Sequence, residues 1–216
     1  MRKLIVSMNM SLDGFMSGPD CELGWHFEYW NTEMAESFCE QLGRADTLLF
    51  GRNTYNAMAQ HWQNRSSSLT ASRGDLAFTE MMTSTRKIVC SRYPQIMSWK
   101  NSASLSGDIP AKVAALKKQE GKDMIIFGSG QLIASLARHD LIDQYLLWIH
   151  PVALGKGKPL FRNEDEKLSL NFRSITTFRS GVMMARYDVL HQPAVFSTGS
   201  EKRRVKKAGS AWSSEM

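Results

Sequence analysis

The sequence has few cysteines and no long hydrophobic run. Its 216 residues include only Cys21, Cys39 and Cys90, which are widely spaced and odd in number. They make neither the framework of a disulfide-rich secreted protein nor a C-x-x-C metal pair. The longest apolar runs, such as 124–127 and 145–149, are far shorter than the roughly 20 residues that cross a bilayer. We therefore expect a protein of the reducing cytoplasm without a membrane-spanning helix.

The sequence also lacks the motifs of metal-dependent and hydrolytic enzymes. His26 and Glu28 match the H-x-E half of a zinc deaminase, but no P-C-x-x-C follows. The histidines show no H-E-x-x-H spacing, and no G-x-S-x-G is present. Residues 155–158 resemble a P-loop fragment, but Pro159 stands where Ser or Thr should be. We predict no metal site and no hydrolytic chemistry.

The net charge of +6 is unevenly distributed. Half of the excess lies after Val195, where two glutamates face five basic residues, namely Lys202, Arg203, Arg204, Lys206 and Lys207. This stretch is rich in Ser and Gly and poor in apolar residues, which is typical of a solvated extension. We predict one domain over residues 1–192 and a basic, flexible tail over 193–216. A nucleic-acid partner is not expected, except for what such a tail could contact.

Hydrophobic patterning predicts alternating strands and helices. Short apolar runs predict buried strands at 3–8, 47–50, 87–90, 124–127 and 145–149. Helical periodicity is present at 29–44, 54–59, 76–82, 109–120 and 131–138, with loops expected at 63–75 and 102–107. Two β-prone runs at 169–178 and 182–190 predict an antiparallel hairpin. The fold class is therefore α/β, with helices on both faces of a mixed, mostly parallel sheet.

Three of the predicted strands end in residues suited to bind phosphate. These residues are Gly51, Arg52 and Thr54, then Ser91 and Arg92, then Gly128, Ser129, Gly130 and Gln131. Glycine permits close approach, the amides of a helix N-terminus attract anions, and arginine offers a bidentate fork. Each group alone could be an ordinary turn, and Ile133 replaces the third glycine of the dinucleotide fingerprint. Together they predict a ligand site at the carboxyl ends of the strands.

Motifs in this order are similar to those of a known family. S-x-D-G lies at 11–14, G-R-x-T-Y at 51–55, KIVCSR at 87–92 and G-x-G-Q at 128–131, followed by LIDQYLLWIHPVALGKGKPLF. Over residues 2–190 the sequence resembles the C-terminal reductase domain of the bifunctional deaminase-reductase of riboflavin biosynthesis. The resemblance implies a three-layer dihydrofolate reductase-like fold, a homodimer and NADPH bound across the carboxyl ends of the strands.

The resemblance also implies roles for the residues named above. Gly51, Arg52 and Thr54 correspond to a phosphate-binding turn, and residues 128–131 lie against the pyrophosphate. Ser91 and Arg92 lie near the adenosine 2′-phosphate, which favours NADPH over NADH. Asp13 belongs to the loop beside the nicotinamide, where it is either a catalytic or substrate contact or a turn residue.

The proton donor is the least defined part of this hypothesis. Glu33 is the predicted donor, although Glu36 lies on the same helix and both could be solvated carboxylates. Trp25 and Trp62 are predicted to stack on a flat substrate, with ordinary packing as the alternative.

The sequence thus predicts an NADPH-dependent oxidoreductase. Its activity would be of the 5-amino-6-(5-phosphoribosylamino)uracil reductase type, or that of a stand-alone relative reducing a C=N or C=O bond of a small heterocycle. The sequence carries no zinc-deaminase signature. The alternatives are a dihydrofolate reductase and a non-catalytic NADPH-binding protein.

Overall fold

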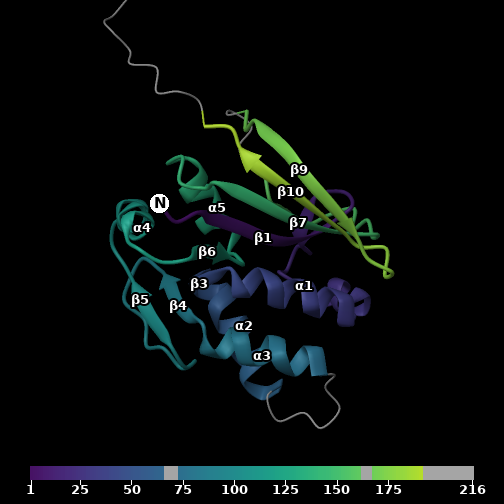
Figure 1. Ribbon diagram of the computed structural model, residues 1–216, viewed down its shortest axis with the longest axis horizontal. Coiled ribbons are helices and arrows are strands. Elements are labelled where there is room, and N and C mark those ends of the chain that lie inside the picture. The colour runs from purple at the N-terminus through teal and green to yellow at the C-terminus, as the bar shows by residue number, and fades with distance from the viewer. Residues whose placement is uncertain (66–72, 162–166, 192–216) are drawn as a thin grey trace, which may run out of the picture.

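The computed structural model describes residues 1–65, 73–161 and 167–191 (Figure 1). The strands are β1 (Leu4–Ser11), β2 (Phe15–Ser17), β3 (Ala45–Gly51), β4 (Arg86–Cys90), β5 (Ser102–Leu105), β6 (Asp123–Ile126), β7 (Gln144–His150), β8 (Lys158–Pro159), β9 (Leu170–Thr177) and β10 (Met183–Val189). The helices are the 3-10 helix η1 (Gly24–Tyr29), α1 (Thr32–Gly43), α2 (Arg52–Arg65), α3 (Arg73–Ser84), α4 (Ile109–Lys118) and α5 (Gly130–Ala137). The predicted tail at 193–216 lies outside the described residues.

The main sheet is mixed, as predicted. Among the described residues it has eight strands in the order β5-β4-β3-β6-β1-β7-β10-β9. Every pair from β5 to β7 is parallel, whereas β10 runs antiparallel to both β7 and β9. The first strand of the chain therefore lies in the middle of the sheet, and the predicted hairpin forms one edge.

Helices cover both faces of the sheet and make three layers. On one face, α1, α2 and α3 pack together over a core that includes Phe50 and Trp148, as Figure 1 shows below the sheet. On the other face, α4 and α5 contribute Val113, Leu132 and Leu136 to a second apolar cluster. The three-layer α/β/α prediction is confirmed.

Helix α1 shows how the local sequence sets these layers. The side chain of Asn31 accepts a hydrogen bond from Met34 N at 2.9 Å and so caps the first turn. Met34, Phe38 and Leu42 recur every four residues, and all three are buried. This single apolar stripe holds the helix against the sheet.

The loop predicted at 102–107 is wrong, because Ser102–Leu105 forms β5 at the edge of the sheet. Its sequence, SASL, contains no β-branched or aromatic residue, so local propensity gives no strand signal. The strand forms because β4 offers it a free edge, with Lys87 opposite Ser102 and Cys90 opposite Leu105.

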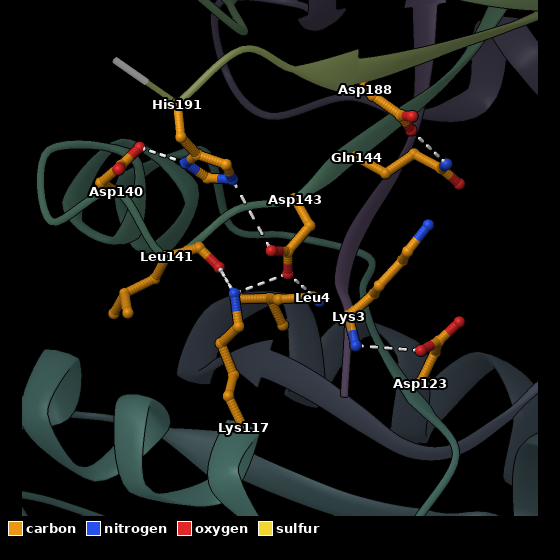
Figure 2. Close-up of polar contacts among 10 residues, drawn as sticks. All are labelled: Lys3, Leu4, Lys117, Asp123, Asp140, Leu141, Asp143, Gln144, Asp188 and His191. Carbon is orange, nitrogen blue, oxygen red and sulfur yellow. Dashed lines mark hydrogen bonds and ion pairs between the residues drawn. The ribbon is translucent and has the colours of Figure 1, made fainter. Parts of the chain in front are cut away.

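A polar network closes the sheet at the end where β1, β6 and β7 begin (Figure 2). Lys117 Nζ donates to Asp143 Oδ2 and to Leu141 O, both at 2.6 Å. The same carboxylate oxygen accepts from Leu4 N at 2.6 Å, so one aspartate joins α4, β1 and the start of β7. On its other side His191 Nε2 lies 3.7 Å from Asp143 Oδ1. These polar groups hold elements of the fold together.

Within the described residues, no helix has the length and apolarity needed to cross a membrane.

Candidate nucleotide and substrate cavity

A large cavity opens where β1, β3, β4 and β6 end. Its volume of about 1070 Å³ lies just above the usual range of ligand pockets. All nine residues predicted from the three strand ends line it, together with side chains from α2, α5 and η1. The sequence therefore identified segments that the fold brings to one place.

The turns after β3 and β6 are in direct contact. Gly51 N donates to Gly128 O at 2.9 Å. A Cβ at position 51 would lie 2.5 Å from Ser129 Oγ and 3.1 Å from Ser129 N, so no side chain fits there. Gly128 has φ +126°, a conformation that side chains rarely adopt. Glycine at both positions lets the starts of α2 and α5 approach each other across the cavity floor.

The cavity is electropositive. Arg52 follows β3, Arg92 follows β4, and Lys158 lies in β8; all three line the cavity. No aspartate or glutamate is among the described residues that line it. These three positive side chains lie near the N-termini of α2 and α5, and no carboxylate among the described lining residues offsets them. The cavity is therefore suited to an anionic ligand.

Another part of the cavity lining, here called the ring wall, is formed by aromatic and imidazole rings. Phe27 lies between two imidazoles, with ring centroids 4.2 Å from His26 and 5.2 Å from His61. Burial, with smaller contributions from His150 and His61, lowers the pKa of His26 to about 4, so its ring is neutral at pH 7. Trp30 and further apolar side chains continue this wall. It offers flat surfaces to a planar ligand.

A hydrogen-bonded pair, a half-buried asparagine and a buried histidine, lies behind this wall. Asn9, on β1, lines the cavity, and its Oδ1 lies 3.1 Å from Nε2 of the fully buried His150. Burial lowers the pKa of His150 to about 4. Its Nδ1 and the Nε1 of Trp25 are buried without a hydrogen-bond partner among the described residues.

The structure places the two predicted catalytic carboxylates away from the cavity lining. Asp13 accepts from Ser11 Oγ at 2.6 Å, Leu154 N at 3.1 Å and Gly155 N at 2.7 Å. The Ser11 hydroxyl, followed by these backbone amides, holds the pKa of Asp13 below its ordinary value. These contacts are those expected of a turn residue. They join the loop after β1 to the loop after β7.

Glu33 instead faces the turn between β9 and β10. Its carboxylate lies 3.0 Å from Arg179 Nε and accepts from Arg179 N at 3.1 Å. A catalytic role for Asp13 or Glu33 remains a prediction.

The two predicted tryptophans differ. Trp62 lines the cavity but is almost fully buried and packs in the apolar core. Trp25 is not among the lining residues; its ring stands edge-on to His150, with centroids 5.3 Å apart. Packing thus accounts for most of the contacts of both rings.

Sequence reasoning missed Asn9, His61 and His150, and it considered His26 only as part of a deaminase motif. They come from β1, η1, α2 and β7, and no local spacing joins them. The one available signal was polar residues, Ser7 and Asn9, inside an otherwise apolar strand. Among the described residues, no group of three or more His, Cys, Asp or Glu could hold a metal ion.

Comparison with protein families matches residues 2–184 to the RibD C-terminal domain. The chain belongs to this family. It is 30% identical to the uncharacterised protein YyaP of Bacillus subtilis (strain 168), over 86% of this chain and 94% of that protein. Membership places the chain in a riboflavin-pathway reductase family.

Solved structures share the fold. A candidate riboflavin biosynthesis protein from Shewanella sp. PV-4 has a TM-score of 0.68 at 22% identity, covering 88% of this chain and 99% of that one. A pyrimidine reductase-like protein from Corynebacterium diphtheriae has a TM-score of 0.56 at 15% identity, covering 88% and 93%. RibD of Acinetobacter baumannii has a TM-score of 0.65 at 13% identity; 88% of this chain corresponds to 58% of RibD. At sequence identities this low, the similarity to these structures shows a shared fold and nothing more.

Proposed function

We propose that the protein is an NADPH-dependent reductase of a C=N or C=O bond in a small heterocyclic substrate. The observation that carries the proposal is one electropositive cavity that unites three glycine-, serine- and arginine-bearing strand ends. The substrate would be 5-amino-6-(5-phosphoribosylamino)uracil or a related compound. A protein of Thermotoga maritima with this reductase activity in its name shares the fold at a TM-score of 0.59 and 11% identity.

The residues present fit a dinucleotide phosphate. Gly51 and Gly128 keep side chains out of the cavity floor, where a Cβ at position 51 would meet Ser129. Arg52 and Thr54, at the start of α2, would hold one phosphate, and residues 128–131, which lead into α5, the pyrophosphate. Ser91 and Arg92 would hold the 2′-phosphate. Bound NADPH would supply the hydride, while the ring wall would orient the substrate.

The absence of a carboxylate from the described cavity lining weighs against the dihydrofolate reductase alternative. Enzymes of that type use a carboxylate to serve the pterin ring, and Glu33 is paired with Arg179 instead. A non-catalytic NADPH-binding protein would share the phosphate contacts but would not consume the cofactor.

The test is calorimetric titration of the purified protein with NADPH and, separately, with NADH. We expect tight NADPH binding and at least tenfold weaker NADH binding, because Arg92 would lose its 2′-phosphate partner. Equal affinities would contradict the 2′-phosphate contact, and no binding of either cofactor to folded protein would refute the reductase proposal. Screening the complex for NADPH oxidation by aminouracil substrates then separates an enzyme from a binding protein.

We further propose a homodimer through the β9–β10 face. Strand β9 is an eight-residue edge strand on which Phe172 and Ile175 are 54% and 51% exposed. Tyr187 lies beside Phe172, with ring centroids 5.8 Å apart, so the apolar surface is continuous across the two strands. Sedimentation analysis should give a dimer for the wild type and a monomer for Phe172→Glu. A wild-type monomer at micromolar concentration would contradict this assembly.

A further inference from the structure

The inward face of β1 carries a row of polar side chains in the centre of the sheet. Ser7 Oγ donates to Gln41 Oε1 at 3.2 Å and accepts from Trp148 Nε1 at 3.1 Å. Ser11 is likewise paired, with Asp13. Asn9, between them, has one side-chain partner among the described residues, the imidazole of His150. Of the three, Asn9 has an amide group left over for a ligand.

The imidazole determines which end of that amide is left over. His150 is fully buried, and its ring is fixed by Trp25 and Tyr29, with centroids 5.3 and 5.6 Å away. A neutral imidazole carries one proton, and the Oδ1 of Asn9 can only accept. With Oδ1 of Asn9 facing Nε2 of His150 at 3.1 Å, the tautomer that makes this hydrogen bond is the one that carries its proton on Nε2. The NH₂ group of Asn9 is then the part that remains for the cavity.

Asn9 directly follows Met8, whose side chain lies beside the turn that would hold the pyrophosphate: a Cβ at Gly128 would be 3.7 Å from Met8 Cε. Strands β1 and β6 pair as far as Val6 opposite Ile126. Three residues further along each chain segment are Asn9 and Ser129, and both line the cavity. The ring wall of His26, Phe27 and His61 adjoins the Asn9–His150 pair, because the ring centroids of His26 and His150 lie 5.9 Å apart. A planar substrate between this wall and the nicotinamide would have its acceptor atom within reach of the Asn9 amide.

We propose that Asn9 donates a hydrogen bond to the oxygen or nitrogen of the C=O or C=N bond that is reduced, and that His150 is the positioning residue that aims it. The proposal rests on the proposed function and names the substrate contact of the same site. Hydride adds to the carbon, the π electrons move to the heteroatom, and that atom takes a proton from water. Asn9 keeps its own protons. Its amide stabilises the negative charge that develops on the heteroatom, as donors of an oxyanion hole do.

The experiment measures binding of 5,6-diaminouracil, an uncharged planar probe whose ring carbonyl oxygens can accept the Asn9 hydrogen bond, to the NADP⁺ complex by calorimetry. Asn9→Ala and Asn9→Asp each remove the NH₂ donor, so we expect at least tenfold weaker probe binding. NADP⁺ affinity should stay within about twofold, because no phosphate contact changes. Asn171→Ala, which alters an exposed asparagine of β9, is the matched control and should bind the probe as the wild type does.

Variants of His150 separate positioning from packing. His150→Gln keeps a side-chain N–H that can donate to Asn9 Oδ1, so probe binding should stay within about threefold of wild type. His150→Phe keeps the ring shape without the donor and should lose as much affinity as Asn9→Ala. In Asn9→Asp, the new carboxylate should raise the pKa of His150, which ¹⁵N NMR of the imidazole reports.

Unchanged probe binding by Asn9→Ala, or no probe binding by a wild type that binds NADP⁺, overturns the proposal. Equal losses in His150→Gln and His150→Phe overturn the positioning role. If the wild type fails to bind NADP⁺, the reductase function fails. The comparison of wild type and Asn9→Ala is then repeated with the probe alone, and equal binding or no binding overturns the role of Asn9.

Discussion

The two ends of the same sheet use polar residues in opposite ways. Where β1, β6 and β7 begin, Asp143 satisfies Lys117 and Leu4 N at once, and the network joins three elements (Figure 2). Where β1, β3, β4 and β6 end, Arg52 and Asn9 point polar groups at a cavity, and His150 and Trp25 each keep a buried nitrogen without a partner among the described residues. The paired end holds the fold together, and the open end is built to be completed by a ligand.

The largest expected effect is at the paired end. Asp143→Ala leaves the ammonium of Lys117, whose side chain is 4% exposed, without its carboxylate. We expect the free energy of unfolding to fall by about 3 to 5 kcal/mol, because an unpaired buried charge is costly. Urea unfolding measures this loss. Asp140→Asn removes a 65% exposed carboxylate of the same region and keeps a residue type that tolerates the left-handed backbone at this position, φ 54°; it should cost less than about 1 kcal/mol, and similar losses in the two variants would show that the pair is unimportant.

The next largest effect is a pH dependence of the free energy of unfolding, and it comes from His150 at the cavity end of the sheet. Burial lowers the pKa of His150 from 6.5 to about 4, so the unfolded chain binds this proton more strongly than the folded one. Stability is therefore highest above pH 6.5 and falls as pH drops from 6.5 to 4, by roughly 3 kcal/mol for this group. His26 shifts in the same direction and adds to the loss.

Urea unfolding between pH 7.5 and 4.5 tests this linkage. The wild type should lose stability more steeply than His150→Gln, which has no imidazole to protonate. Parallel pH profiles for the two proteins would rule out His150 as a source of the acid sensitivity.

A smaller effect should separate ligand binding from stability. Arg52 is exposed and lines the cavity, so Arg52→Ala should weaken NADPH binding by about 1.5 to 3 kcal/mol and leave urea unfolding unchanged. Arg44→Ala removes an exposed arginine that does not line the cavity and should change neither. Unaltered NADPH affinity in Arg52→Ala would remove this residue from the phosphate site.

The smallest effect is expected at Glu33. Its partner Arg179 has a 92% exposed side chain, so Glu33→Gln should cost about 0.5 kcal/mol of stability. NADPH binding should not change, and steady-state kinetics should show an unchanged kcat with any substrate found. A hundredfold fall in kcat would instead support the catalytic role that the sequence suggested for Glu33.

What the sequence could predict depended on whether the signal was local. Gly51-Arg52 and residues 128–131 stand directly after apolar strands, so both the strands and their place at one sheet edge followed from periodicity and topology. Strand β5 was missed because its residues have no strand propensity and it depends on β4. Asn9 and His150 meet only because β1 pairs with β7 in one register, which residue spacing does not reveal.

The central position of β1 has a consequence for synthesis of the chain. Leu4 pairs with Met124, and Ile5 pairs with Gln144, so this apolar strand leaves the ribosome long before either neighbour exists. It stays unpaired on both edges through most of translation, when strand edges are prone to aggregate. Folding of the sheet must wait for β6 and β7, and the nascent chain should depend on chaperones until residues near 150 have emerged.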